Sequence, residues 1–447
     1  MKTPICDFVR EYANSNSLRL HMPGHKGIAL LGIEQLDITE IEGADVLYSA
    51  NGIIEQSQMN ASRIFGTEST LYSTEGSSLC IRAMLYLVGR YAKSLGKRPY
   101  ILAARNAHKS FMYAAGVLNI DVDWIYAEQS NSLLSCSIDA SELDKKLSLM
   151  ADRPVAVYIT TPDYLGYTAD VSAISEVCHK YGVLLMVDNA HGAYLKFLPK
   201  DRHPISLGAD ICCDSAHKTL PALTGAAYLH ISRGAPRFFG ESADSAMAVF
   251  ASTSPSYIIL QSLDLLNKYL AQDYSEKLSC FIEKLDKLKQ DLKEKGFSLA
   301  GDEPMKLCIV PKSYGYTGAE LAAYLADKGI VCEFFDKDHL VMMPTPDIED
   351  IELERIKNVL LSLERGEAIT QMPPVPTVAQ RILPIGEAML SPSVELDVRE
   401  CEGRVLADAQ ISCPPAIPIV VCGERIDSAA IDCFKYYGID RCKVIKE

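Results

Sequence analysis

Asp188 and Lys218 are the two residues whose types and spacing most strongly suggest a chemical site. Asp188 ends an apolar run, and Lys218 follows thirty residues later within the run SAHKT at 215–219. Pyridoxal phosphate chemistry needs a lysine that forms a Schiff base, a carboxylate that keeps the pyridine nitrogen protonated, and donors for the phosphate. A carboxylate at a buried strand end would pair with the pyridinium and make the ring an electron sink.

The run Gly76-Ser77-Ser78 is a candidate for holding the phosphate of that cofactor. It opens a long apolar helical pattern, and the N–H groups and dipole at a helix N-terminus favour an anion. Taken singly, each feature has an ordinary explanation: a helix N-cap, a turn aspartate and a solvated lysine. The order of phosphate loop, acidic strand end and lysine is what favours pyridoxal phosphate.

Three histidines lie close to these residues in the sequence or follow a predicted strand. His191 and His217 flank the candidate cofactor groups, and imidazole titrates near neutral pH, so we expect one of them to act as general acid or base. His108 follows a predicted strand end and is either a loop histidine or an imidazole that stacks on the cofactor ring.

We expect no metal site. His21 and His25 have the spacing of a helical chelate, but the proline and glycine between them exclude a good helix. The fourteen cysteines include no Cys-x-x-Cys pair that a structural zinc site would use. Cys212 and Cys213 lie in an apolar stretch, where core packing is the expectation.

The charge balance excludes some classes of partner. The chain of 447 residues has 44 Lys and Arg against 58 Asp and Glu, a net charge of −14, which argues against a nucleic-acid binder. No apolar run is long enough to span a membrane, and the charged N-terminus is unlike a signal peptide. We therefore expect a cytoplasmic protein with reduced thiols and no membrane partner.

Short apolar strands alternate with helices from about residue 72, with strands expected at 100–104, 155–160, 183–187 and 225–231. This alternation predicts an α/β fold whose sheet is mostly parallel, with helices on both faces. Ligands collect at the carboxyl ends of such strands, where Asp188 is placed. A smaller α+β part follows, with helices at 276–295 and 318–328, strands at 307–310 and 330–335, and a proline-rich linker at 372–376.

Five runs in order resemble the bacterial ornithine/lysine/arginine decarboxylase family: HMPGHK at 21–26, RNAHKS at 105–110, DNAHGA at 188–193, SAHKTLPALT at 215–224 and STSPSY at 252–257. The resemblance covers nearly the whole chain and implies the fold-type I (aspartate-aminotransferase) fold with pyridoxal phosphate as cofactor. It implies an N-terminal segment at 1–50, a large cofactor domain at 51–275, a small α+β domain at 276–370 and the family's C-terminal domain at 375–447. The length matches the short form of the family.

The resemblance also assigns roles to single residues. Lys218 would form the Schiff base, Asp188 would hold the pyridinium, and His108 and Ala190 would pack on the two ring faces. The implied phosphate ligands are Ser77, Ser78, Ser215 and His217.

In relatives of this fold the site lies between two subunits, so the resemblance implies a homodimer or a larger assembly. Ser252 or its neighbours would then reach the cofactor of the partner subunit. The distal cation of a basic substrate would need an acidic subsite, and Glu424 is the candidate for it.

The implied reaction converts arginine, lysine or ornithine to an amine and carbon dioxide, which would feed polyamine metabolism. Four stretches depart from the family pattern. Asn189 stands where glutamate is frequent, and the phosphate loop at 74–78 has serines where threonine is usual, which preserves its donors. The stretch 45–52 replaces a paired-histidine stretch, and 385–389 replaces another familiar block. These departures leave two alternatives open.

The first alternative is an aminotransferase with the same cofactor, which would clamp the substrate α-carboxylate with an arginine such as Arg355, Arg365 or Arg381. The second is a pyridoxal-phosphate-binding homologue whose activity is lost or altered.

Overall fold

The computed structural model describes all of the chain except residues 127–133, 409–411, 414–416 and 447. The described residues divide into two compact units, each built from two separate stretches of the chain. The first unit comprises Met1–Arg98 and Val171–Lys277, and the second comprises Pro99–Asp170 and Leu278–Glu447. The division into four domains that the sequence suggests stays a prediction.

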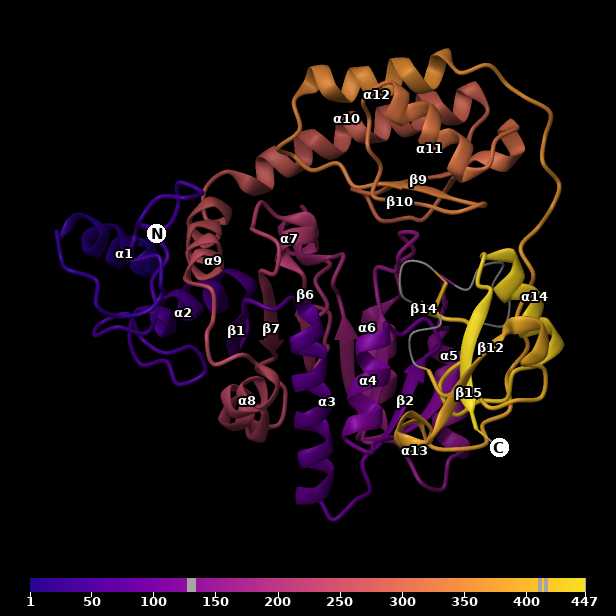
Figure 1. Cartoon of the computed structure of the whole chain (residues 1–447), viewed down its shortest axis with the longest axis horizontal. Helices are drawn as coiled ribbons and strands as arrows, with labels where there is room; N and C mark the ends of the chain where they lie inside the picture. Colours follow the sequence, from indigo (N-terminus) through magenta and orange to yellow (C-terminus); the bar gives the residue numbers. More distant parts are fainter. Residues whose placement is uncertain (127–133, 409–411, 414–416, 447) are drawn as a thin grey trace. The chain divides into compact units, whose positions relative to one another are not determined.

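The first unit is built on four strands in the order β1-β7-β6-β5, of which Figure 1 labels β1, β7 and β6. Strand β5 (Leu184–Asp188) runs parallel to β6 (Ile211–Asp214), whereas β7 (Ala227–Ile231) pairs antiparallel with both β6 and β1 (Ser69–Ser73). All residues of β6 and β7 are buried, as expected for strands covered on both faces. The helices of this unit are α1 (Pro4–Asn14), α2 (Ile53–Phe65), α3 (Ser77–Ser94), α6 (Val171–Lys180), η1 (Ala193–Phe197), α7 (Ala216–Thr219), α8 (Arg237–Phe250) and α9 (Tyr257–Leu270).

The second unit contains three strands in the order β4-β2-β3 and a separate four-stranded antiparallel sheet. Strand β2 (Tyr100–Ala104) is parallel to both β3 (Asp121–Ile125) and β4 (Ala156–Thr160). The antiparallel sheet has the order β10-β11-β9-β8, from β8 (Ser298–Ala300), β9 (Leu307–Val310), β10 (Phe334–Phe335) and β11 (Leu340–Met342). Its helices include α4 (Lys109–Val117), α5 (Ala140–Leu149), α11 (Gly318–Asp327), α12 (Asp350–Ser362), α13 (Ile385–Leu390) and α14 (Ser428–Tyr436), and α10 (Tyr274–Lys295) begins in the first unit.

The C-terminal part of the second unit shares a buried apolar cluster with Cys308 of β9, Phe334 of β10 and Val341 of β11. Strand β12 (Ser393–Asp397) pairs antiparallel with β15 (Arg441–Ile445), and β13 (Ser412–Cys413) pairs with β14 (Ile417–Pro418). Helix α14 places Phe434 and Cys433 in a buried apolar cluster with residues of these strands.

The sequence-based fold class is confirmed, including most of the strands that it places. The strand expected at 330–335 is wrong in its first four residues, because only Phe334–Phe335 pairs and Val331 is 91% exposed. Cys212 and Cys213 are buried in β6 as expected, and burial raises the pKa of both thiols well above the ordinary value. Among the helices that the structure describes, none is long and apolar enough to cross a membrane.

Candidate active site

Asp188 is the last residue of β5 and is only 2% exposed. Its register partner on β6 is Cys213, whose thiol donates to Asp188 Oδ1 at 3.7 Å. The same oxygen accepts the backbone N–H of Ala190 at 3.2 Å. The turn after β5 therefore holds a buried carboxylate at the carboxyl end of the parallel strand pair, as the sequence predicts.

Lys218 lies in the short helix α7, which begins directly after the neighbouring strand β6. Its Nζ lies 3.1 Å from Nε2 of His191, which is buried in the turn after β5. The structure thus brings the candidate Schiff-base lysine and one candidate acid/base histidine into direct contact. A proton can move between these two nitrogens without any other group.

The candidate phosphate ligands meet at the start of α3. Gly76 is the N-cap of this helix, has a φ of 72° and provides no side-chain cap, so the first N–H groups of α3 are not bonded to a capping side chain. Ser215 Oγ donates to Ser77 Oγ at 2.8 Å, and the N–H of Gly76 donates to Gly225 O at 2.8 Å. An uncapped helix N-terminus beside two hydroxyls is suited to an anion.

The other predicted cofactor ligands of the first unit lie near the N-terminus of α3. Ser78 is the second residue of α3 and is half-buried. His217 is also half-buried, and its Nδ1 lies 2.9 Å from Ala226 O. Ser252 is exposed, and its N–H donates to Oε1 of Glu75 at 2.8 Å. Glu75 directly precedes Gly76, the N-cap of α3. Its predicted role toward a partner subunit stays a prediction.

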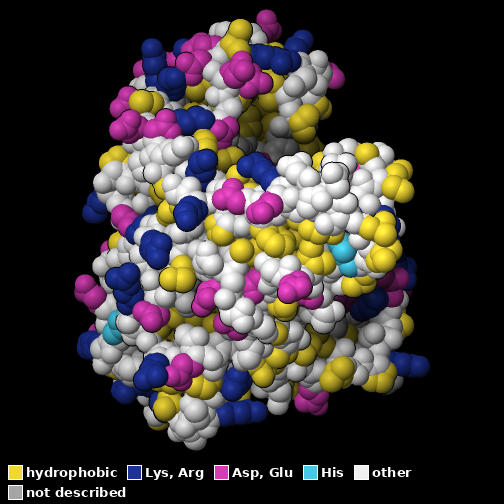
Figure 2. All heavy atoms as spheres, turned by 90° about the vertical axis from the view of Figure 1, so that its left-hand side faces the viewer, with side chains coloured by type: hydrophobic (Ala, Val, Ile, Leu, Met, Phe, Trp, Pro, Cys, Tyr) yellow, Lys and Arg dark blue, Asp and Glu magenta, His cyan; other side chains and the backbone are white. Residues whose placement is uncertain are grey.

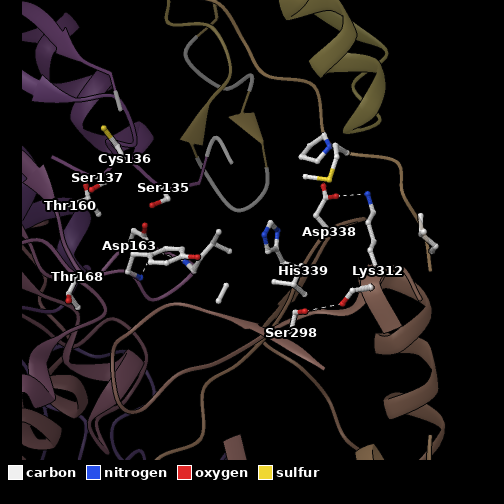
Figure 3. A pocket seen from close by; sticks show the side chains of 18 of the residues that line it. Ser135, Cys136, Ser137, Thr160, Asp163, Thr168, Ser298, Lys312, Asp338 and His339 are labelled. Atoms are coloured by element: carbon white, nitrogen blue, oxygen red, sulfur yellow. Dashed lines mark hydrogen bonds and ion pairs between the residues drawn. The ribbon is translucent and has the colours of Figure 1, made fainter. Parts of the chain in front are cut away.

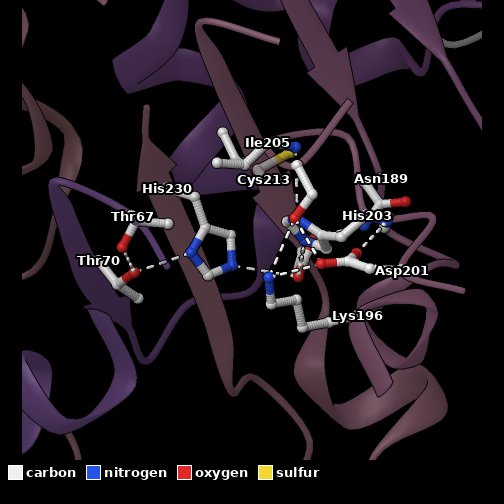
Figure 4. A network of polar contacts seen from close by, with 12 residues as sticks. Thr67, Thr70, Asn189, Lys196, Asp201, His203, Ile205, Cys213 and His230 are labelled. Atoms are coloured by element: carbon white, nitrogen blue, oxygen red, sulfur yellow. Dashed lines mark hydrogen bonds and ion pairs between the residues drawn. The ribbon is translucent and has the colours of Figure 1, made fainter. Parts of the chain in front are cut away.

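A buried polar network lies directly beside the candidate cofactor ligands (Figure 4). The sequence analysis did not predict it. Asp214 Oδ2 accepts from Nε2 of His203 at 3.0 Å and from Nε2 of His230 at 3.1 Å. Its other oxygen accepts the side-chain amide of Asn189 at 2.6 Å. Burial opposes ionisation of Asp214, but the two histidines hold its pKa well below its usual range.

These three residues also form the one group of potential metal ligands found among the described residues. Eleven positions separate His203 from Asp214 and sixteen separate Asp214 from His230. This spacing matches no motif from which the group could be recognised in the sequence. The available signal was the position of Asp214, which directly precedes the predicted ligand Ser215.

Comparison with known proteins identifies the family. The family model "Orn/Lys/Arg decarboxylase, major domain" matches residues 3–302. The chain belongs to this family. It is 28% identical to an arginine decarboxylase of Bacillus subtilis over 95% of this chain and 91% of that protein, and 27% identical to one of Halalkalibacterium halodurans over 95% and 91%. The fold resembles that of the Escherichia coli constitutive lysine decarboxylase, with a TM-score of 0.78 and 18% identity over 100% of this chain and 82% of that chain.

Membership of the Orn/Lys/Arg decarboxylase family confirms the resemblance and makes the chain a pyridoxal-phosphate-dependent decarboxylase. The residues of the first unit fit that cofactor by the chemistry of their donors. Besides the uncapped N-terminus of α3, Thr219 Oγ1 and Asn189 Oδ1 are buried and have no hydrogen-bond partner among the described residues. Thr219 directly follows Lys218 in the sequence, and Asn189 directly follows Asp188. Both unpartnered oxygens can therefore bind a further polar group.

His108 belongs to the second unit, where it caps the N-terminus of α4. Its Nδ1 accepts the N–H of Ser110 at 3.2 Å. Asn106, at the carboxyl end of β2, is 2% exposed, and neither polar atom of its side chain has a partner among the described residues. Asn106 is thus a candidate ligand that sequence reasoning missed, and the stacking roles of His108 and Ala190 stay predictions.

Glu424 is buried in the second unit of this decarboxylase and already has partners. Its Oε2 accepts the N–H of Val421 at 2.7 Å and lies 3.6 Å from Nη2 of Arg105. Burial raises the pKa of this carboxyl, and Arg105 opposes the shift. The cavity that Glu424 lines measures about 10 Å³, room for about one water molecule. A substrate cation would therefore have to displace Arg105 or widen this cavity, and the subsite stays a prediction.

The three arginines considered as a transaminase clamp each donate to the protein itself. Arg355 donates to Lys328 O, Arg365 to Ser313 O at 3.4 Å and Arg381 to Asp121 Oδ1 at 2.5 Å. The guanidinium group of each arginine is thus already bound to an acceptor in the protein, and none is positioned by these contacts to bind a substrate carboxylate.

The second unit also contains a cavity of about 800 Å³, large enough for a small metabolite (Figure 3). Asp163 and His339 line it, and so do Lys312 and Asp338, which form an ion pair at 2.5 Å. Burial raises the pKa of Asp163, although Ser135 and the N–H of Tyr167 oppose that shift. The acidic and hydroxyl groups of this cavity suit a small polar ligand.

Proposed function

We propose that this chain decarboxylates a basic amino acid to the corresponding amine and carbon dioxide, with arginine ahead of lysine and ornithine. The contact between Lys218 and His191 at 3.1 Å, beside the buried Asp188, is the observation that carries the proposal. Arginine is placed first because the curated relatives that match over nearly their whole length and have a named activity are arginine decarboxylases. The amine product would feed polyamine metabolism.

Each residue of the site has a defined task in this proposal. Pyridoxal phosphate, when bound, supplies the electron sink for the pair released with carbon dioxide. Lys218 holds the cofactor, Asp188 keeps the pyridine nitrogen protonated, and the start of α3 with Ser77 and Ser215 binds the phosphate. His191 lies within hydrogen-bond distance of Lys218 Nζ, so it can hold the proton that the substrate carbon needs after carbon dioxide leaves.

A substrate panel tests this function. Purified protein supplied with pyridoxal phosphate is incubated separately with arginine, lysine and ornithine, and carbon dioxide, amine and keto acid are measured. We expect equal amounts of carbon dioxide and amine, with the highest kcat/KM for arginine. Keto acid without carbon dioxide would favour an aminotransferase, and a bound chromophore without any turnover would favour a homologue that has lost activity.

The protein would work as a homodimer in the cytoplasm. The support is an exposed apolar segment in the N-terminal part of the first unit, where four leucines are each more than 80% exposed: Leu18, Leu20, Leu30 and Leu31. Figure 2 faces this side of the molecule and shows apolar side chains on its surface. A second copy of the chain would cover them and would place Ser252 near the partner's cofactor. Sedimentation of wild type and of a Leu30→Asp, Leu31→Asp variant should give dimer and monomer.

A further inference from the structure

Asp214 is the centre of a buried network at the carboxyl end of β6, and Figure 4 shows its partners His203, His230 and Asn189. It accepts hydrogen bonds from His203, His230 and Asn189, and all four side chains are 0% exposed. A buried carboxylate with three good donors is held in one orientation, because losing any donor would leave charge without compensation.

The hydrogen bonds assign the tautomers of both histidines. Nδ1 of His203 accepts the N–H of Ile205 at 3.4 Å, and Nδ1 of His230 lies 2.9 Å from the hydroxyl of Thr70. Each ring therefore carries its proton on Nε2 and donates it to Asp214. Burial lowers the pKa of His230, and Asp214 opposes that shift. A metal ion would need the Nε2 lone pairs that these protons occupy.

The network connects the two strand ends that carry the cofactor residues. Asn189 directly follows Asp188, and its backbone N–H donates to Cys213 O at 2.9 Å. Asp214 directly precedes Ser215, which is the N-cap of the helix that carries Lys218. The side-chain bond between Asn189 and Asp214 thus joins the residue after the candidate pyridinium partner to the residue before the phosphate ligand.

We propose that Asp214 is a positioning residue for the cofactor site, and that through Asn189 it fixes the carboxylate of Asp188 relative to Lys218. The inference rests on the proposed use of pyridoxal phosphate. It also gives the amide of Asn189 a physical role, because this side chain donates to Asp214. A second carboxylate in this place would lie against Asp214, whereas the amide donates to it at 2.6 Å.

The opposite end of β6 provides a matched control. Asp210, just before the strand, is 4% exposed and accepts from His179 Nε2 at 3.0 Å and from the N–H of Leu185 at 2.7 Å. It is also a buried aspartate that binds a histidine, but its hydrogen bonds involve none of the predicted cofactor ligands. Asp210→Asn therefore changes stability without touching the network around Asp214.

The experiment compares Asp214→Asn and Asp210→Asn in the full-length protein loaded with pyridoxal phosphate. Equilibrium dialysis gives the Kd of the cofactor, visible circular dichroism reports its orientation, and denaturant unfolding reports stability. We expect Asp214→Asn to raise the Kd about ten- to hundredfold, as for loss of a hydrogen bond to a charged group, and to change the visible dichroic band. Asp210→Asn should keep the wild-type band and a Kd within about twofold.

Asn189→Leu keeps Asp214 and removes its amide donor together with the unpartnered Oδ1 of Asn189, and it serves as the second variant if Asp214→Asn does not fold. It should change the dichroic band in the same direction. A wild-type Kd and band in the variants of Asp214 and Asn189, equal effects in Asp210→Asn, or a stoichiometric metal ion in the purified protein would each overturn the inference. A wild-type protein that binds no pyridoxal phosphate would contradict the proposed function as well, so the two failures are distinguishable.

Discussion

Strand β6 has a buried aspartate at each end, and their surroundings differ. At its amino end, Asp210 binds His179, whose side chain is 48% exposed to solvent. At its carboxyl end, Asp214 binds two histidines that are fully buried, and the neighbouring residues carry the candidate cofactor ligands. Similar pairs of residue types thus hold the strand in place at one end and support a reaction site at the other, as expected where ligands bind at carboxyl ends of parallel strands.

The largest expected difference between the two ends concerns activity. Lys218→Ala, at the carboxyl end, should lower decarboxylation roughly a thousandfold or more and abolish the visible absorbance of the bound cofactor. His179→Ala, at the amino end, should leave both unchanged. Steady-state kinetics and absorbance spectra check the pair. Equal losses in both variants would remove the functional distinction between the two ends.

The next difference concerns the free energy of unfolding. Asp214→Ala leaves two buried histidines and an amide without their acceptor, so we expect a loss of about 3–5 kcal/mol. Asp210→Ala removes a buried acceptor, but its partner His179 can hydrogen-bond to water instead. We therefore expect the free energy of unfolding to fall by about 1–3 kcal/mol. Urea unfolding at pH 7 measures both. A larger loss at Asp210 would show that burial of the histidines is not what distinguishes the ends.

The pH dependence of stability sharpens the same comparison. The pKa of Asp214 is lowered in the folded protein, so its ionised form stabilises the fold above the unfolded pKa of about 4, and this stabilisation is lost as pH falls further. The difference in unfolding free energy between wild type and Asp214→Asn should therefore be largest near pH 7 and should shrink below about pH 4. Urea unfolding across this range is the check, and a difference that grows toward acid pH would contradict the assignment.

The smallest effect on the free energy of unfolding is expected for His179, the half-exposed partner of Asp210. His179→Ala should change the unfolding free energy by less than about 1 kcal/mol, since its pair with Asp210 is partly open to water. High salt should reduce the effect further. A loss comparable to that of Asp214→Ala would mean that the amino end is as tightly coupled to the fold as the carboxyl end.

Much of this arrangement follows from local sequence signals. The apolar runs that form β2 and β5 are bounded by glycine, proline or charged residues, and such signals need no tertiary information. The placement of Asp188 at a strand end, and of Ser77 at the start of a helix, follows from the same patterns. These patterns and the family motifs together identified the candidate cofactor site.

The network around Asp214 could not be predicted in this way. It depends on the antiparallel pairing of β6 with β7, which sets Cys212 opposite His230, and on a turn that returns His203 to the same place. The prediction of a strand at 330–335 failed in its first four residues for a related reason. Val331 belongs to an apolar run but finds no partner strand, so its side chain remains exposed.

The central claim is that Lys218 holds pyridoxal phosphate at the carboxyl ends of β5 and β6. Borohydride reduction of the loaded protein, followed by peptide mass spectrometry, tests it directly because reduction fixes the cofactor to the lysine that holds it. The account predicts one phosphopyridoxyl group per chain, on Lys218. Attachment to another lysine, or no attachment in a protein saturated with the cofactor, would contradict it.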